Sequence, residues 1–225
     1  MYPFVVPRAV RSDPSGLMVL SPKTARVIRS RGRSCFFEPA ARSRGKFYDR
    51  DIRARSLTIM IQPGQPLPDA TLYEFFEVEK DGCALGPNAF SVQHLAEGKT
   101  IVIFGLPGAF TPTCSARHVP GYLAHFDALR AKGVDEIWCV SVNDAFVMGA
   151  WARAQGTDDK IRMLGDGSAE FTSKLGLEQD LSKRGMGVRS QRYAMVVKDG
   201  VVTALQVEAP GQFAVSSAES ILAIL

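Results

Sequence analysis

Apolar and polar positions show two periodic patterns from residue 60 onward, and neither pattern is sustained over residues 1–59. Short apolar runs of strand length alternate with longer segments whose apolar residues recur at helical spacing. The predicted strands cover 71–79, 101–105, 137–142, 161–164, 191–197 and 201–207. The predicted helices cover a short stretch capped by Ser91 before Gly98, then 113–131, 145–154 and 168–175, and a last helix opened by a capping box at 216–219. This alternation predicts a layered α/β domain over residues 60–225.

Two features of the pattern specify the architecture further. The run 101–105 is continuously apolar, as expected of a central strand covered on both faces. Asp199 and Gly200 form a turn dipeptide that joins the last two strands into a hairpin. The order of strands and helices is typical of a thioredoxin-like fold, in which helices flank a central mixed sheet.

Charge separates the chain into two unlike parts. Residues 1–59 carry eleven Arg and two Lys against four acidic residues, whereas 60–225 hold fourteen basic and nineteen acidic residues. The basic part is rich in Ser and Pro, so we expect a disordered extension outside the folded domain. It has three candidate origins: an organellar transit peptide, a basic arm for an anionic surface, or sequence upstream of a true start at Met60. The third origin predicts a cytoplasmic protein, and the first a mitochondrial or plastid one.

Composition excludes several classes of function. The longest apolar stretches, such as 101–104 and 137–142, are far shorter than the roughly 20 residues that a membrane helix needs. Few aromatic residues accompany the basic stretch, which argues against nucleic acid as a partner. The four cysteines, at positions 35, 83, 114 and 139, form no C-x-x-C pair and have no metal-knuckle spacing. We therefore expect no membrane span, no structural metal and a reducing compartment.

The candidate chemistry lies in residues 107–114, which read Pro-Gly-Ala-Phe-Thr-Pro-Thr-Cys. This segment joins a predicted central strand to a helix, where the reaction sites of open α/β sheets gather. With Thr111 as the N-cap and Pro112 as the first helical residue, Cys114 falls in the first turn. Unpaired N–H groups and the helix dipole there favour a thiolate, the nucleophilic form of cysteine. A buried filler is the commoner fate of a cysteine, but no apolar periodicity places position 114 on a core face, so we expect an exposed sulfur.

The spacing of Pro107, Thr111 and Cys114 resembles the active-site signature of peroxiredoxins. The wider strings at 104–115, 118–121 and 141–147 resemble the peroxiredoxin-5 or plant type II branch, especially its bacterial glutathione-dependent members. The similarity runs from about residue 61 to the end of the chain. It does not include residues 1–59.

This resemblance implies a role for each matching residue. Cys114 would be the peroxidatic cysteine, which attacks a peroxide oxygen and becomes a sulfenic acid. Thr111 would hydrogen-bond to the thiolate or the substrate, and Pro107 would shield the sulfur from water. The arginine of the family pocket matches Arg192, which precedes Tyr193.

Four further residues have alternative interpretations. Arg189 is the neighbouring rival to Arg192. His118, four residues after Cys114 on the same helix face, supports the thiolate as a cation or has a packing or subunit-contact role. Cys139 matches the resolving cysteine of plant type II enzymes, but its mid-strand position favours a buried filler. Cys35 and Cys83 have no counterpart.

The function implied is a thiol peroxidase that reduces hydrogen peroxide and organic hydroperoxides. Glutathione, glutaredoxin or thioredoxin would supply the electrons, with no metal, haem or flavin cofactor, and the relatives commonly form homodimers. The alternatives are a thiol-disulfide oxidoreductase or a redox-sensing binding module on the same fold. The first is disfavoured because Thr111 stands where a C-x-x-C motif has its first thiol.

Overall fold

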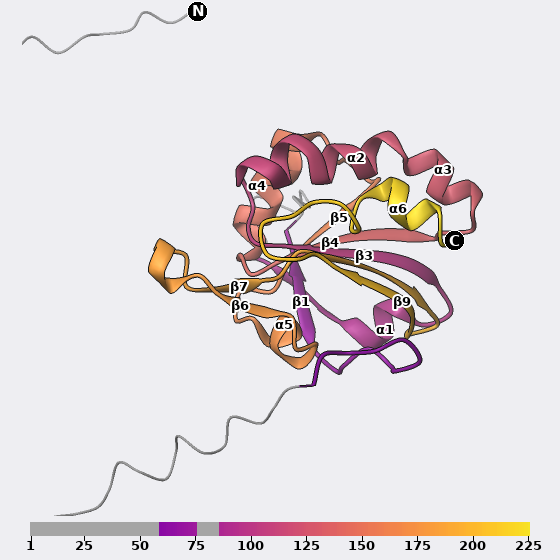
Figure 1. Cartoon of the computed structure of the whole chain (residues 1–225), viewed down its shortest axis with the longest axis horizontal. Helices are drawn as coiled ribbons and strands as arrows, with labels where there is room; N and C mark the ends of the chain where they lie inside the picture. The colour runs from indigo at the N-terminus through magenta and orange to yellow at the C-terminus, as the bar shows by residue number, and fades with distance from the viewer. Residues whose placement is uncertain (1–58, 76–85) are drawn as a thin grey trace, which may run out of the picture. The chain divides into compact units, whose positions relative to one another are not determined.

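A computed structural model of the chain describes residues 59–75 and 86–225 (Figure 1). The predicted disordered extension, apart from Ile59, lies outside the described residues, as do Cys35, Cys83 and the end of the strand predicted over 71–79. None of the helices in the described ranges is both long and apolar enough to cross a membrane.

Seven strands form one mixed sheet in the order β2-β1-β5-β4-β3-β8-β9. Their bounds are β1 (Thr71–Glu74), β2 (Asn88–Ser91), β3 (Thr100–Leu106), β4 (Glu136–Ser141), β5 (Arg162–Gly165), β8 (Tyr193–Lys198) and β9 (Val201–Val207). Strands β3, β4 and β5 run parallel, whereas β1, β8 and β9 pair antiparallel with their neighbours. The predicted fold class, a mixed central sheet of the thioredoxin-like type, is confirmed.

Strand β3 shows why its sequence is apolar at every position. Ile101 and Ile103 enter one buried cluster, and Val102 and Phe104 enter a second cluster on the opposite face. Successive side chains of a strand point to opposite faces, so a strand covered on both sides needs apolar residues throughout.

Helices cover both faces of the sheet (Figure 1). On one face lie α2 (Val119–Ala124), α3 (Phe126–Ala131), α4 (Ala145–Gln155) and α6 (Ala218–Leu222). On the other lie α1 (Val92–Ala96) and α5 (Glu170–Lys174). The predicted Ser91 cap of α1 is confirmed, since its side chain accepts from the backbone N–H of His94. Helix α4 is capped by Asp144, which accepts from the backbone N–H of Val147.

The prediction of a single α-helix over 113–131 is wrong, because this segment consists of a π-helical turn followed by two short α-helices. A helical turn starts at Pro112 and passes into a π-helical turn, η1 (Cys114–His118), before α2 and α3. Pro120 has no N–H to continue the usual hydrogen-bond ladder. His125 separates α2 from α3, and its ring nitrogen Nδ1 shares the Gly121 carbonyl with its own backbone N–H.

Two predicted helix starts are also corrected. Helix α5 begins at Glu170, two residues later than expected, and its N–H groups at Phe171 and Thr172 donate to Asp166. The N-cap of α6 is Ser217 with Ser220 as its partner, so the predicted capping box at 216–219 is out of register by one residue.

The sequence pattern missed three short strands. One is β2, which pairs with β1. The others are β6 (Glu178–Asp180) and β7 (Val188–Ser190), which form a separate two-stranded sheet. A 3₁₀ turn, η2 (Ser182–Arg184), lies at its tip and ends at Gly185, whose φ of 72° suits glycine.

Candidate active site

The loop between β3 and the helix that begins at Pro112 is held by polar contacts at its base. The Thr111 hydroxyl donates to the Gly108 carbonyl at 2.9 Å. Asn143, from the loop after β4, accepts from the Ala109 N–H at 3.0 Å and from the Ser141 hydroxyl at 2.7 Å. Thr111 is the residue before the helix, but its side chain bonds within the loop. The loop thus has a fixed shape just ahead of Cys114.

Cys114 lies in the first turns of this helix, as predicted, but its exposure was predicted wrongly. The residue is fully buried and belongs to the apolar cluster that contains Phe104, Tyr122 and Trp151. The indole N–H of Trp151 also donates to the Ser115 hydroxyl at 3.1 Å, which ties this turn to α4. Because the π-helical turn interrupts regular helical spacing, the pattern of apolar residues gave no sign that position 114 faces inward.

Arg192 is the charged group that meets the Cys114 sulfur. Its Nη2 lies 3.4 Å from Sγ, and its Nη1 lies 2.9 Å from His118 Nδ1. Arg192 immediately precedes β8, where the Tyr193 ring lies so close to Gly105 that a Cβ on Gly105 would overlap it. Glycine at position 105 therefore permits the close strand packing that places the arginine.

His118 is buried and uncharged. Arginine can only donate and a backbone carbonyl can only accept, so Nδ1 accepts from Arg192 and Nε2 donates to the Ser216 carbonyl at 3.0 Å. Burial, and then the charge of Arg192, lower the pKa of His118 from 6.5 to about 3. This contradicts the interpretation of His118 as a cation beside the thiolate, and its contacts are those of a hydrogen-bonded packing residue.

Glu208 organises the loop that receives His118, and sequence reasoning missed it. One of its oxygens, Oε1, accepts from the N–H groups of residues 214–216 and from the Ser216 hydroxyl, all at 2.7–2.8 Å. Burial by itself would raise the pKa of Glu208, but these hydrogen bonds hold it below its usual value. The Glu208 N–H also donates to the Arg192 carbonyl at 2.9 Å. A single carboxylate directly after the last predicted strand, 201–207, offers no sequence signal for this role.

Arg189 and Pro107 have different surroundings. The Arg189 guanidinium donates to the carbonyls of Met186 and Val142 at 2.8 and 3.0 Å, and no described contact joins it to the sulfur. Pro107 lies on the wall of the cavity that also contains Thr111 and Arg192. The structure therefore brings together Pro107, Thr111 and Arg192, and leaves Arg189 in a structural position.

Cys139 lies in the middle of β4, paired with Phe104 on one side and Met163 on the other. It is fully buried in the same apolar cluster as Cys114, and both thiols are free. Burial, and then the nearby Cys114 sulfur, raise the pKa of the Cys139 thiol well above its usual value.

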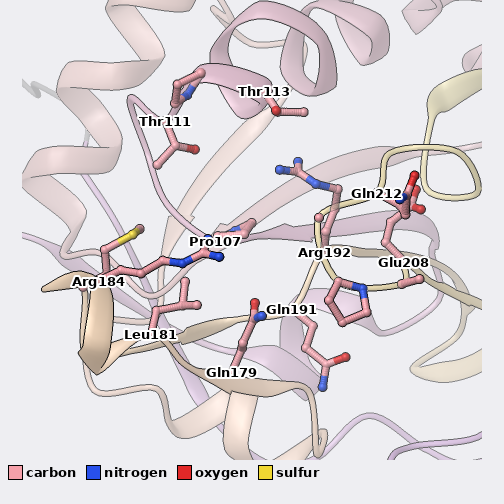
Figure 2. Close-up of a pocket in the computed structure, with 15 residues that line it drawn as sticks. Pro107, Thr111, Thr113, Gln179, Leu181, Arg184, Gln191, Arg192, Glu208 and Gln212 are labelled. Carbon is pink, nitrogen blue, oxygen red and sulfur yellow. The ribbon is translucent and has the colours of Figure 1, made fainter.

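A cavity of about 520 Å³ is lined by Thr113, the residue before Cys114, and by Arg192, which contacts the Cys114 sulfur (Figure 2). Cys114 itself is buried behind this lining. Its lining combines the loop before Cys114, the β6–β7 sheet with its tip, and the loop after β9. The lining residues are Pro107, Thr111, Pro112, Thr113, Gln179, Leu181, Arg184, Met186, Gln191, Arg192, Glu208, Ala209, Pro210, Gly211 and Gln212. Figure 2 shows Thr111 and Thr113 on one side of this space, with Arg184 and Arg192 flanking it.

The site offers one thiol, one guanidinium and the N–H groups of a helix start. Such a set suits attack by sulfur on a group that gains negative charge as its bond breaks. Within residues 59–75 and 86–225, no three His, Cys, Asp or Glu side chains form a group that could hold a metal ion.

The chain resembles known proteins over its folded part. A family model described as Redoxin matches residues 62–222. Peroxiredoxin-2B of Arabidopsis thaliana is 47% identical over 165 residues, which cover 73% of this chain and 98% of that protein. Reduced Prx3 of Vibrio vulnificus, solved in complex with H₂O₂, matches with a TM-score of 0.68 and 54% identity over 73% of this chain and 99% of that one.

A third relative has a different name. A crystal structure from Burkholderia cenocepacia, provisionally named a thioredoxin reductase, matches with a TM-score of 0.71 and 66% identity over 74% of this chain and 98% of that one. The present sequence has no C-x-x-C pair, the usual dithiol of thioredoxin-like redox motifs. Other plant relatives have chloroplastic or mitochondrial in their names.

Proposed function

This chain belongs to the Redoxin family, among its peroxiredoxins, and from that premise we propose that Cys114 is its peroxidatic cysteine and that glutathione recycles it. The chain is a thiol peroxidase, an oxidoreductase that acts on peroxides. The observation that carries the assignment of the cysteine is the 3.4 Å contact between Arg192 Nη2 and Cys114 Sγ.

In the first step the Cys114 thiolate attacks the terminal oxygen of the peroxide. An S–O bond forms, the O–O bond breaks, and the leaving oxygen takes a proton to become water or an alcohol, so that sulfur is oxidised to a sulfenic acid. Negative charge grows on the leaving oxygen, and the Arg192 guanidinium and the N–H groups of the first helical turn stabilise it.

Thr111 and Pro107 have supporting roles in this proposal. The Thr111 proton is already donated to the Gly108 carbonyl, so the hydroxyl oxygen is left to accept a hydrogen bond from the peroxide. Pro107 gives the cavity an apolar wall near the reacting atoms and limits the access of water.

Recycling requires the oxidised sulfur to reach a thiol. Glutathione attacks the sulfenic sulfur, an S–S bond forms, and the hydroxyl leaves as water. A second thiol, from glutathione or glutaredoxin, then releases Cys114. Because the sulfur is fully buried in the described state, the first turn must open toward the cavity before glutathione can react with it. An added oxygen overfills a close-packed site, which favours this opening.

The decisive experiment replaces three of the four thiols in turn. We expect Cys114→Ser to abolish peroxide consumption and Cys35→Ser and Cys83→Ser to retain it, measured with glutathione plus glutaredoxin and, in parallel, with thioredoxin plus its reductase. Retained turnover in Cys114→Ser would refute the assignment of the peroxidatic cysteine. Turnover with the thioredoxin system and none with the glutathione system would show that thioredoxin, and not glutathione, is the reductant.

Oligomeric state and compartment belong to the same proposal. We propose a homodimer, supported by two exposed aromatic rings: Phe146 on α4, and Phe110, which packs against Trp151 of α4. Light scattering after size-exclusion chromatography should give the mass of two chains. We propose a cytoplasmic location, and a mitochondrion or plastid if residues 1–59 act as a transit peptide; imaging of fusions with and without that segment decides between them.

A further inference from the structure

One wall of the cavity beside Cys114 is formed by the β6–β7 sheet and its tip η2. Arg184 projects from this tip toward the cavity (Figure 2). Among the described residues, no hydrogen bond or ion pair engages its guanidinium, whereas Arg189 and Arg192 are both bonded. Arg184 is therefore the cation of this cavity that has no partner within residues 59–75 and 86–225.

We infer that Arg184 binds a carboxylate of the small molecule that enters this cavity to react with Cys114 once the first turn opens. The inference rests on the proposed function in one respect, that Cys114 supplies the reacting sulfur. A guanidinium presents paired N–H donors that match the two oxygens of a carboxylate. Arg184 thus acts as a specificity residue at a distance from the chemistry.

The size of the cavity indicates a ligand larger than hydrogen peroxide. Its volume of about 520 Å³ lies in the range of pockets that hold small organic molecules, roughly 300–1,000 Å³. Leu181, Met186 and Pro210 give it apolar surface, and Gln179 and Gln191 bring amide groups suited to a peptide-like or carbonyl-bearing ligand.

The charges that face the cavity favour an anion. The charged lining residues are Arg184, Arg192 and Glu208. Glu208 is the acidic residue among them, and its Oε1 already accepts four hydrogen bonds from residues 214–216. Arg192 is directed to the sulfur and to His118. Arg184 is therefore the cation left to meet a carboxylate.

Two kinds of molecule carry such a carboxylate to Cys114: a thiol reductant such as glutathione, and a fatty-acid hydroperoxide. The test uses Arg184→Gln, with Arg184→Lys to keep the charge and Lys183→Gln as a matched control. Lys183 is an exposed cation on the same turn that does not line the cavity. Because Arg184 is exposed at a hairpin tip, these variants should fold as the parent protein does.

The first arm measures the second-order rate constant for reduction of oxidised Cys114, by rapid quench and mass spectrometry, with glutathione and with uncharged 2-mercaptoethanol. The second arm measures oxidation of Cys114 by linoleic acid hydroperoxide and by its methyl ester. If the ligand is the thiol, Arg184→Gln lowers the rate constant for reduction by glutathione about fivefold and leaves the rate constant for 2-mercaptoethanol unchanged. If the ligand is the hydroperoxide, Arg184→Gln slows the oxidation of Cys114 by linoleic acid hydroperoxide by about the same factor. Oxidation by the methyl ester then keeps its rate.

In the arm where Arg184→Gln is slowed, Arg184→Lys should retain part of the parent rate constant. Lys183→Gln should retain all of it. The inference is overturned if Arg184→Gln has the same rate constants as Lys183→Gln in both arms. It is also overturned if Arg184→Gln slows the reactions of the carboxylate-bearing and the uncharged reagents equally. If glutathione fails to reduce the parent protein at all, the proposed reductant is wrong, and the hydroperoxide arm alone decides the role of Arg184.

Discussion

Cys114 and Cys139 lie in one apolar cluster and are equally inaccessible, yet their surroundings differ in every other respect. Cys139 is fixed in the middle of β4 between two parallel neighbours. Cys114 follows a shaped loop, lies in a π-helical turn and meets the guanidinium of Arg192. If Cys114 is the reactive thiol, as proposed, then exposure is not what separates it from Cys139.

The difference between the two thiols lies in their polar neighbours and in the backbone that holds them. A strand bonded on both sides cannot release a residue without breaking two ladders of hydrogen bonds. A short helical turn at the rim of a cavity can open locally at a smaller cost. The electrostatic partner and the local freedom of the backbone should both favour reaction at Cys114.

The largest effect is expected from removing the guanidinium that distinguishes the two sites. Arg192→Met should slow the oxidation of Cys114 by hydrogen peroxide by about 10²-fold, the usual scale for losing one preorganised donor. Arg189→Met is the matched control and should have a milder effect, because its guanidinium bonds the carbonyls of Met186 and Val142. Stopped-flow oxidation of the reduced proteins gives both rates, and a larger loss in Arg189→Met would mean that the arginine has been misassigned.

The next effect concerns the buried histidine that accepts from Arg192. The folded-state pKa of His118 is about 3, below its usual 6.5, so the unfolded chain binds the proton first as pH falls. The stabilising contribution of the neutral ring is complete above pH 6.5 and is lost as pH falls toward 3. Between pH 7 and 5 the parent protein should therefore lose about 2 kcal/mol more unfolding free energy than His118→Gln does.

Urea denaturation at the two pH values measures this difference. Comparing the change with pH in each protein removes any constant cost of the substitution. The other titratable groups are common to both proteins, and Glu208, whose pKa lies below its usual value, stays ionised between pH 7 and 5. Equal losses in the two proteins would show that His118 is not held neutral by its surroundings.

The sequence predicted the central strands and their order along the chain well, because fully apolar runs such as β3 and turn dipeptides such as Asp199-Gly200 are local signals. It failed where the outcome depends on contacts distant in sequence. The helix after Cys114 begins with a π-helical turn and is interrupted at His125, and the β6–β7 sheet is too short to show a period of two.

The site was predictable in part for the same reason. The spacing of Pro107, Thr111 and Cys114 is local, and the family resemblance supplied Arg192. The burial of Cys114, the neutral state of His118 and the loop bonded to Glu208 arise from packing between elements up to 98 residues apart. Periodicity and composition do not report such packing.

The smallest effect is expected from removing the second thiol. Cys139→Ser, with Cys139→Ala as an apolar control, should leave turnover with glutathione and glutaredoxin close to that of the parent protein. A disulfide between the two cysteines needs Cα atoms within roughly 7 Å and suitable orientation. Any shift of Cys139 toward Cys114 would break the pairing of β4 with β3 and β5. Glutathione needs only the first turn to open.

Mass spectrometry after one equivalent of peroxide, with and without glutathione, separates the two routes to recycling. A mixed disulfide that adds about 305 Da at Cys114, in the parent and in both Cys139 variants, is the expected product of thiol attack on a sulfenic acid. A rapid disulfide between Cys114 and Cys139, with turnover collapsing in both variants, would contradict it and make Cys139 the resolving thiol. Cys139 would then react in every catalytic cycle, and the sheet around it would have to open during each turnover.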